Sequence, residues 1–120
     1  MSDRHAYQQV NAVGDVTNSS AQIDLVTTPG DVTYINVERL VVSVYKAASG
    51  GGGYIQIKDT GGNPVFTVPA DGVGVYPMDW GDEGFQIGPD LGLQAITAGA
   101  ATEQASASVA FAGHKTLRAI

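Results

Sequence analysis

Residues 54–68 read Tyr54-Ile-Gln-Ile-Lys-Asp-Thr-Gly-Gly-Asn-Pro-Val-Phe-Thr-Val68, and they give the clearest indication of the fold class. Its two ends are rich in the β-branched and aromatic residues that favour strands. The middle, Asp59 to Asn63, consists of Asp, Thr, Gly and Asn, which form turns readily. Two strand-like runs with such a turn between them are typical of a β-hairpin. The stretch therefore predicts antiparallel strands over 54–58 and 64–68.

Runs of the same kind continue on both sides of this hairpin, each bounded by Gly, Pro, Asn or Asp. They are Ala21–Thr27, Val32–Val37, Leu40–Ala47, Val73–Met78, Phe85–Ile87, Leu91–Thr97 and Ser106–Ala112. Between the second and third of these runs, Glu38-Arg39 indicates either a bulge or bend between two strands or one long strand that bends there. The sequence predicts about eight short antiparallel strands.

A helix is the alternative over Leu93–Ala112, because Ala is the best helix former and Leu93, Ile96 and Ala100 fall on one side of a helix. Gly99, Thr102 and the alternating Ser residues of this segment oppose it. The prediction for this segment is two strands.

The composition agrees with an all-β chain. The 120 residues include 16 Gly and 5 Pro, only 15% are charged, and 43% are hydrophobic, which is enough to form a core. Short strands separated by turns predict a two-sheet, jelly-roll-like sandwich. An immunoglobulin-like sandwich is the alternative fold, but the chain has no Cys and therefore lacks the Cys, Trp, Cys spacing of that family.

Residues 1–19 are predicted to form an extended N-terminal arm, and residues 20–120 a single β-sandwich domain. Tyr7, Val10 and Val13 are isolated apolar residues about three apart in the arm. Gly14 and Asp15 oppose a helix there. Two interpretations fit: an arm that pairs only where something receives it, and a frayed terminus without a role.

Charge and composition exclude several classes of function. The chain has 12 acidic and 6 basic residues, a formal charge of −6, and its Lys and Arg form no cluster, so we expect no nucleic-acid partner. No apolar run approaches the roughly 20 residues that span a bilayer, and the polar N-terminus indicates no export signal, so we expect no membrane partner. We expect synthesis in a reducing cytosol, because there is no Cys.

No residue pattern indicates catalysis. His5 and His114 have no catalytic motif around them, and a metal site of the cupin kind needs a close pair of histidines that the sequence lacks. The sequence therefore predicts a protein that is not an enzyme, with no catalytic residues, no metal site and no cofactor.

The segment Met78–Gly84 places three carboxylates beside an aromatic residue in a turn. Oxygen ligands at this density suit Ca²⁺, although ordinary acidic turns are commoner and the spacing is not that of an EF-hand. Tyr76, Asp79 and Trp80 form a candidate sugar platform, in which an aromatic face and a carboxylate hold a pyranose. The simpler interpretation is that Trp80 fills the end of the core.

In style and architecture, the chain resembles the small single jelly-roll proteins called decoration or cement proteins, which bind the heads of tailed phages. The residues that carry this resemblance are the N-terminal arm, the hairpin 54–68, the loop Pro69-Ala-Asp-Gly72 and the alternating Ala, Ser and Val of the last strand.

The resemblance implies a structural virion protein on the capsid exterior, made in the host cytoplasm, that reinforces contacts between shell subunits. It implies a homo-oligomer, usually a trimer, and the major capsid protein or another virion protein as the partner. We expect partner contact at Arg4, Tyr7 and Val10. The alternatives are a carbohydrate-binding module and an adhesion domain of a virion tail or fibre.

Overall fold

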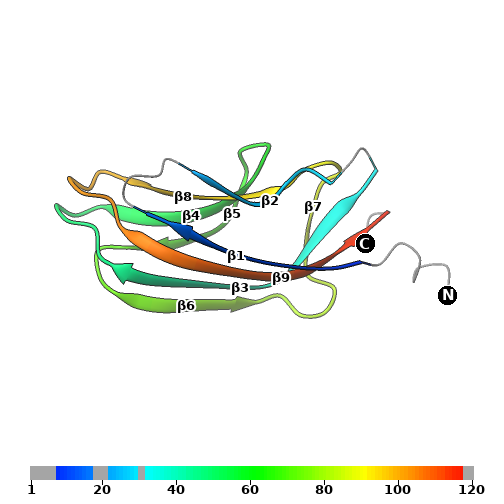
Figure 1. The fold of residues 1–120 in the computed structure, drawn as a ribbon, viewed down its shortest axis with the longest axis horizontal. Helices are drawn as coiled ribbons and strands as arrows, with labels where there is room; N and C mark the ends of the chain where they lie inside the picture. Colours follow the sequence, from blue (N-terminus) through cyan, green and yellow to red (C-terminus); the bar gives the residue numbers. More distant parts are fainter. Residues whose placement is uncertain (1–7, 18–21, 30–31, 118–120) are drawn as a thin grey trace.

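The computed structural model describes residues 8–17, 22–29 and 32–117, and these residues form strands and no helix (Figure 1). Nine strands lie in two antiparallel sheets. In chain order they are β1 (Gln8–Val16), β2 (Ile23–Val26), β3 (Tyr34–Lys46), β4 (Gly53–Asp59), β5 (Pro64–Pro69), β6 (Gly74–Asp79), β7 (Phe85–Ile87), β8 (Leu93–Gly99) and β9 (Ser106–Thr116). The predicted all-β sandwich is confirmed.

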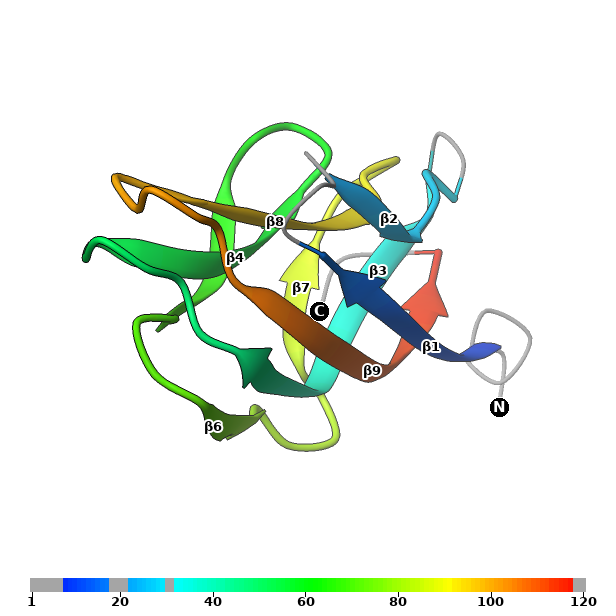
Figure 2. The ribbon, with the colours of Figure 1, turned by 60° about the vertical axis from the view of Figure 1, so that its left-hand side comes forward.

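The strand order is that of a jelly roll. Sheet A has the order β1-β9-β3-β6, with β7 also paired to β3, and sheet B has the order β2-β8-β4-β5 (Figure 2). The pairs are nested around the β4–β5 hairpin, because β3 pairs with β6, β2 with β8 and β1 with β9. One long hairpin rolled up so that successive pairs alternate between two sheets gives this order. The predicted jelly-roll-like sandwich is therefore confirmed.

Strand β3 settles the alternative left open at Glu38-Arg39. It is one strand of 13 residues, and its register with β9 shifts between Val37 and Arg39, so Glu38 is an extra residue opposite β9. Such an insertion is a β-bulge, which bends a strand and increases its twist. Figure 1 shows this bend, because the first part of β3 (cyan) runs at an angle to the rest.

The described part of the N-terminal segment belongs to the sandwich. Residues 8–16 form strand β1, which pairs with β9 from Gln8 opposite Lys115 to Val16 opposite Ala107. Val16 is fully buried, and Val10 and Ala12 pack against the core. The apolar and polar residues of this segment alternate too weakly to predict a strand on their own. Pairing with β9, about 100 residues later in the chain, stabilises the strand.

The helix considered over Leu93–Ala112 is absent, and β8 and β9 occupy that segment. In β8 every second residue is buried, beginning with Leu93 and Ala95, as expected for a strand with one face on a core. Pairing with β4 and β2 outweighs the helical preference of the Ala residues.

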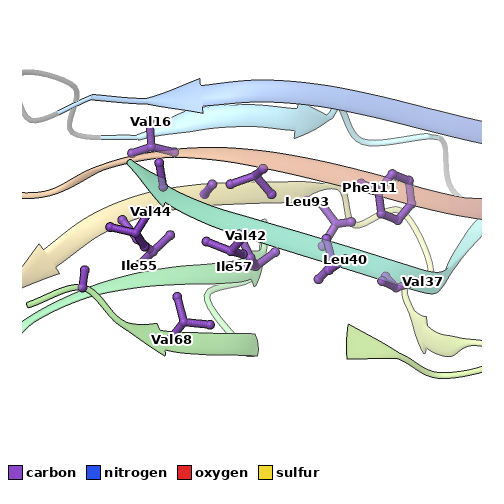
Figure 3. Close-up of a cluster of buried hydrophobic side chains, with 14 of the residues drawn as sticks. Val16, Val37, Leu40, Val42, Val44, Ile55, Ile57, Val68, Leu93 and Phe111 are labelled. Carbon is purple, nitrogen blue, oxygen red and sulfur yellow. The ribbon is translucent and has the colours of Figure 1, made fainter. Parts of the chain in front are cut away.

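The core lies between the two sheets (Figure 3). In the central part of β3 the buried residues are Leu40, Val42 and Val44, and in β4 they are Ile55 and Ile57. Because successive side chains of a strand point to opposite faces, the intervening residues of β3 lie on the face of sheet A that points away from sheet B. We call this the outer face of sheet A.

The predicted hairpin over 54–68 is confirmed, and its turn is organised by Asp59. The buried Asp59 carboxylate accepts hydrogen bonds from the backbone N–H of Gly61 (2.8 Å) and of Asn63 (3.0 Å) and from the Asn63 side-chain amide. A carboxylate that bonds the backbone two residues ahead forms an Asx turn. The turn residues of the sequence therefore define both the hairpin and its register.

Candidate interaction surface

The outer face of sheet A carries apolar side chains where a solvent-facing sheet usually carries polar ones. In register across four strands, Val13 of β1 lies opposite Ala110 of β9, Ala110 opposite Val41 of β3, and Val41 opposite Pro77 of β6. We call this row the apolar band. Val13 is 78% exposed, Ala110 and Pro77 are exposed, and Val41 is half-buried.

The surroundings of the apolar band are small or weakly polar. The next row is Asp15, Ser108, Ser43 and Val75, of which Val75 is 64% exposed. On the other side, Arg39 of β3 lies opposite Asp79 of β6, so two opposite charges neighbour each other there. Apart from Asp15, Arg39 and Asp79, the side chains in and beside the apolar band are small and uncharged. Contiguous exposed apolar surface of this kind marks protein contact sites.

At its other end the outer face is polar and buried. The Nδ1–H of His114 donates to Oε2 of Glu38 at 2.7 Å, and both side chains are buried. Asn36, also fully buried, donates to Thr116 Oγ1 at 3.2 Å and accepts from Gln86 Nε2 at 2.9 Å. We call these five residues the polar cluster. Its side-chain hydrogen bonds link β3, β7 and β9, in addition to the backbone hydrogen bonds that pair these strands.

The chemistry of the polar cluster is structural. A histidine hydrogen-bonded to a carboxylate is part of many catalytic sites, but it then needs a nucleophile or substrate within reach of its second nitrogen. Here the side chains of His114 and Glu38 are only 5% and 7% exposed, so a substrate does not reach them. Burial with complete pairing is what stabilises such a group inside a protein.

Of the predicted partner-contact residues, Arg4 and Tyr7 lie outside the described residues. Val10 lies in β1 opposite Gly113, half-buried and packed against the core. Its side chain therefore points into the sandwich, whereas Val13, three residues later in the same strand, points outward.

The residues of the candidate sugar platform do not share one surface. Tyr76 lies opposite the buried Val42, and Tyr76 and Trp80 pack against the core. Trp80 also contacts Phe66 edge-on, with ring centroids 6.1 Å apart. Asp79 points to the outer face, and its Oδ1 accepts from the backbone N–H of Gly81 at 2.7 Å. The two aromatic side chains and the carboxylate thus lie on opposite sides of β6.

Sequence reasoning did not identify the apolar band, although the strand alternation contains a signal for it. Val41 falls between the buried Leu40 and Val42, and Tyr45 follows the buried Val44, so both are outward-facing apolar residues. That Ala110, Val13 and Pro77 align with Val41 depends on the register of three strand pairs, which no local pattern specifies.

Within residues 8–17, 22–29 and 32–117, no helix is long and apolar enough to cross a membrane. In the same part of the chain, no three His, Cys, Asp or Glu residues gather closely enough to hold a metal ion.

No family model matches the chain, and no curated protein matches its sequence. Among solved structures, it is similar to the virus-like particle of extra small virus from the giant freshwater prawn Macrobrachium rosenbergii, with a TM-score of 0.39, 13% identity, and coverage of 91% of this chain and 79% of that chain. It is also similar to the Gt and Gx strains of infectious bursal disease virus, with TM-scores of 0.35 and 0.33 and identities of 15% and 12%.

The chain covers 31% and 36% of the two bursal disease virus chains, against 92% and 94% of its own length. It thus spans about a third of each of them. These likenesses are weak and assign no function to the chain.

Proposed function

We propose that this chain is a structural virion protein that binds the outside of a phage capsid and reinforces contacts between shell subunits. The observation that carries the proposal is the apolar band, an exposed and uncharged row of side chains that crosses a rigid sheet. The role is one of binding, without a catalysed reaction. The resemblance of the sequence to decoration proteins supplies the kind of partner, which is the major capsid protein or another virion protein.

Physical reasoning supports attachment through the outer face of sheet A. Burial of apolar surface contributes about 25 cal/mol per Å², and a sheet face loses little conformational freedom when it is covered. A particle presents many identical sites, so weak contacts suffice when several chains are linked. A formal charge of −6 disfavours contact with DNA and suits the exterior of a DNA-filled shell.

The proposal includes two finer features. The N-terminal segment around Arg4, Tyr7 and Val10 contributes to the partner contact, and its residues 8–16 form β1, which includes Val13 of the apolar band. The protein acts as a homo-oligomer, for which the resemblance implies three copies. The chain is made in the host cytoplasm and is added to the exterior of the particle.

Co-sedimentation with shells assembled from the major capsid protein of the same phage tests the proposal. Val41→Asp and Val75→Asp place a charge in or beside the apolar band and are expected to raise the dissociation constant about tenfold, a change that corresponds to about 1.4 kcal/mol. Thr67→Asp is the matched control, because Thr67 is exposed on β5 of sheet B, away from the band. It is expected to bind like the unmodified protein.

Equal binding of all three variants would contradict attachment through the outer face, and failure of the unmodified protein to bind would contradict the shell as partner. Specific binding on a glycan array that disappears in Trp80→Ala would instead favour the carbohydrate-binding alternative.

A further inference from the structure

Among the described residues, five strands lie at a sheet edge: β1, β6 and β7 in sheet A, and β2 and β5 in sheet B. An edge strand has unpaired backbone N–H and C=O groups, which proteins protect with proline, charge, bulges or short length. Four of these edges are protected in one of these ways. β5 begins at Pro64 and ends at Pro69, β6 contains Pro77, β7 has only three residues, and β2 has four residues and an irregular register.

Strand β1 is the exception among the described edges. It has nine residues without Pro, Lys or Arg, its register with β9 is regular throughout, and the structure pairs it only with β9 among the described strands. Asp15 is its single charged residue. A long and regular edge of this kind is a template for pairing with another chain.

The sequence of β1 indicates which kind of strand can pair with its free edge. Val10-Asn11-Ala12-Val13-Gly14-Asp15-Val16 reads almost alike in both directions around Val13. Valine stands at both ends, a small residue stands on each side of the centre, and an amide at one position matches a carboxylate at the other. In an antiparallel pair related by a twofold axis, each residue meets the one at the same distance on the other side of the centre.

We propose that β1 pairs antiparallel with β1 of a second copy of this chain, about a twofold axis at Val13. On the outer face, Val13 then lies opposite Val13 of the second copy, and Asn11 lies opposite Asp15 of the second copy. On the inner face, Val10 lies opposite Val16 of the second copy. Sheet A continues across the axis as one sheet, in the order β6-β3-β9-β1 followed by the same strands in reverse.

The chemistry of this register favours a second copy over a different partner. Cross-strand neighbours interact directly, and like charges opposite each other destabilise a sheet. In a chain of formal charge −6, this register places the only carboxylate of the strand opposite an amide that can donate to it. It also covers Val13, which is 78% exposed in one chain, and makes the apolar bands of both copies continuous.

The pairing does not depend on the virion role, and it predicts two copies where the resemblance to decoration proteins implies three. Light scattering at micromolar concentrations is therefore expected to give twice the 12.4 kDa of one chain. Val13→Asp places two carboxylates opposite each other on the axis and is expected to raise the dissociation constant at least about tenfold.

The matched control is Val75→Asp, which makes the same change at a residue exposed to 64% on the same face, but on β6 at the opposite edge of the sheet. It is expected to stay dimeric. Loss of shell binding in Val75→Asp with an intact dimer separates the proposed function from the pairing, since either can fail without the other. Far-UV circular dichroism verifies that both variants keep the strand signal.

A charge exchange tests the register. Asn11→Asp alone places two carboxylates opposite each other on each side of the axis and weakens the dimer about tenfold. Combining it with Asp15→Asn restores one carboxylate opposite one amide and the original net charge, so the dissociation constant is expected to return to the original value.

A disulfide tests the position of the axis, because the chain has no other Cys. Cα atoms directly opposite each other in an antiparallel pair lie about 4.5–5.5 Å apart, within the range that a disulfide spans. Under mild oxidation, Val13→Cys is expected to give a covalent dimer at least about tenfold faster than Val75→Cys, since its two thiols are held opposite each other.

A monomer or a trimer at these concentrations would overturn the proposal, as would a Val13→Asp variant that remains dimeric. Failure of Asp15→Asn to rescue Asn11→Asp, or equal cross-linking of the two Cys variants, would overturn the register.

Discussion

One end of the outer face of sheet A and the middle of that face reverse the usual arrangement of a sheet surface, in which polar side chains are exposed and apolar ones are buried. At one end, Asn36, Glu38 and His114 are polar and buried, and at the middle, Val13, Val41 and Pro77 are apolar and mostly exposed. The buried end is linked by hydrogen bonds that compensate its loss of water. The exposed middle contributes little to folding, and it is the surface through which we propose that the chain contacts another molecule.

The difference predicts that mutations in the polar cluster and mutations in the apolar band have different consequences. Changes in the polar cluster lower the free energy of unfolding, because a buried polar group that loses its partner is not resolvated. Changes in the apolar band leave that free energy almost unchanged and act on association. The following predictions run from the largest expected effect on stability to the smallest.

His114→Ala is expected to lower the free energy of unfolding by about 3–5 kcal/mol, because it leaves the Glu38 carboxylate buried without its partner. Urea titration followed by the fluorescence of Trp80, the single Trp of the chain, measures this loss. Loss of a solvent-exposed ion pair lowers the free energy of unfolding by less than about 1 kcal/mol, so a loss that small in His114→Ala would contradict the burial of the polar cluster.

Replacing both members of this pair separates the unpaired charge from the lost packing. Glu38→Met combined with His114→Leu removes both polar groups and keeps their volume, so we expect it to be more stable than His114→Ala by about 2 kcal/mol or more. The same urea titration compares the two variants. A double variant less stable than His114→Ala would mean that the polar groups contribute beyond their mutual pairing.

Asn36→Ala is expected to cost about 2 kcal/mol, since it removes the acceptor of Gln86 and the donor to Thr116 at a fully buried site. Thr67→Ala, at an exposed residue of β5, is the control and is expected to change the free energy of unfolding by less than about 0.5 kcal/mol. Similar losses in both variants would argue against a special role of the polar end.

Val13→Thr and Val75→Thr are expected to change the free energy of unfolding by less than about 0.5 kcal/mol at low protein concentration, because both side chains are exposed and Thr also favours strands. At higher concentration, the unmodified protein and Val75→Thr gain stability from pairing, and Val13→Thr gains less. Melting curves at two concentrations measure this. An equal gain for both variants would show that Val13 is not at the twofold contact.

Much of the fold follows from local residue patterns. The alternation of Leu40, Val42 and Val44 defines the buried face of β3, and the turn formers after Lys58 define the β4–β5 hairpin. Both are interactions between residues close in the chain, so a short window of sequence contains them.

The site is less predictable because its residues meet over long separations. Glu38 and His114 are 76 residues apart, and Asn36 and Thr116 are 80 apart, so neither pair forms a motif. The sequence places Tyr76 and Trp80 close together and so suggests a shared aromatic surface. In the folded chain, both side chains pack against the core.

Residue patterns alone predict that this chain forms strands, where most of them lie and which face of the central ones is apolar, because alternation and turn chemistry are local. The folded structure was needed to show that residues 8–16 join sheet A, that Glu38 is a bulge and that Val13, Ala110, Val41 and Pro77 align. These features depend on register: a shift of one residue moves every side chain of a strand to the other face, and the register is set by partners distant in the chain.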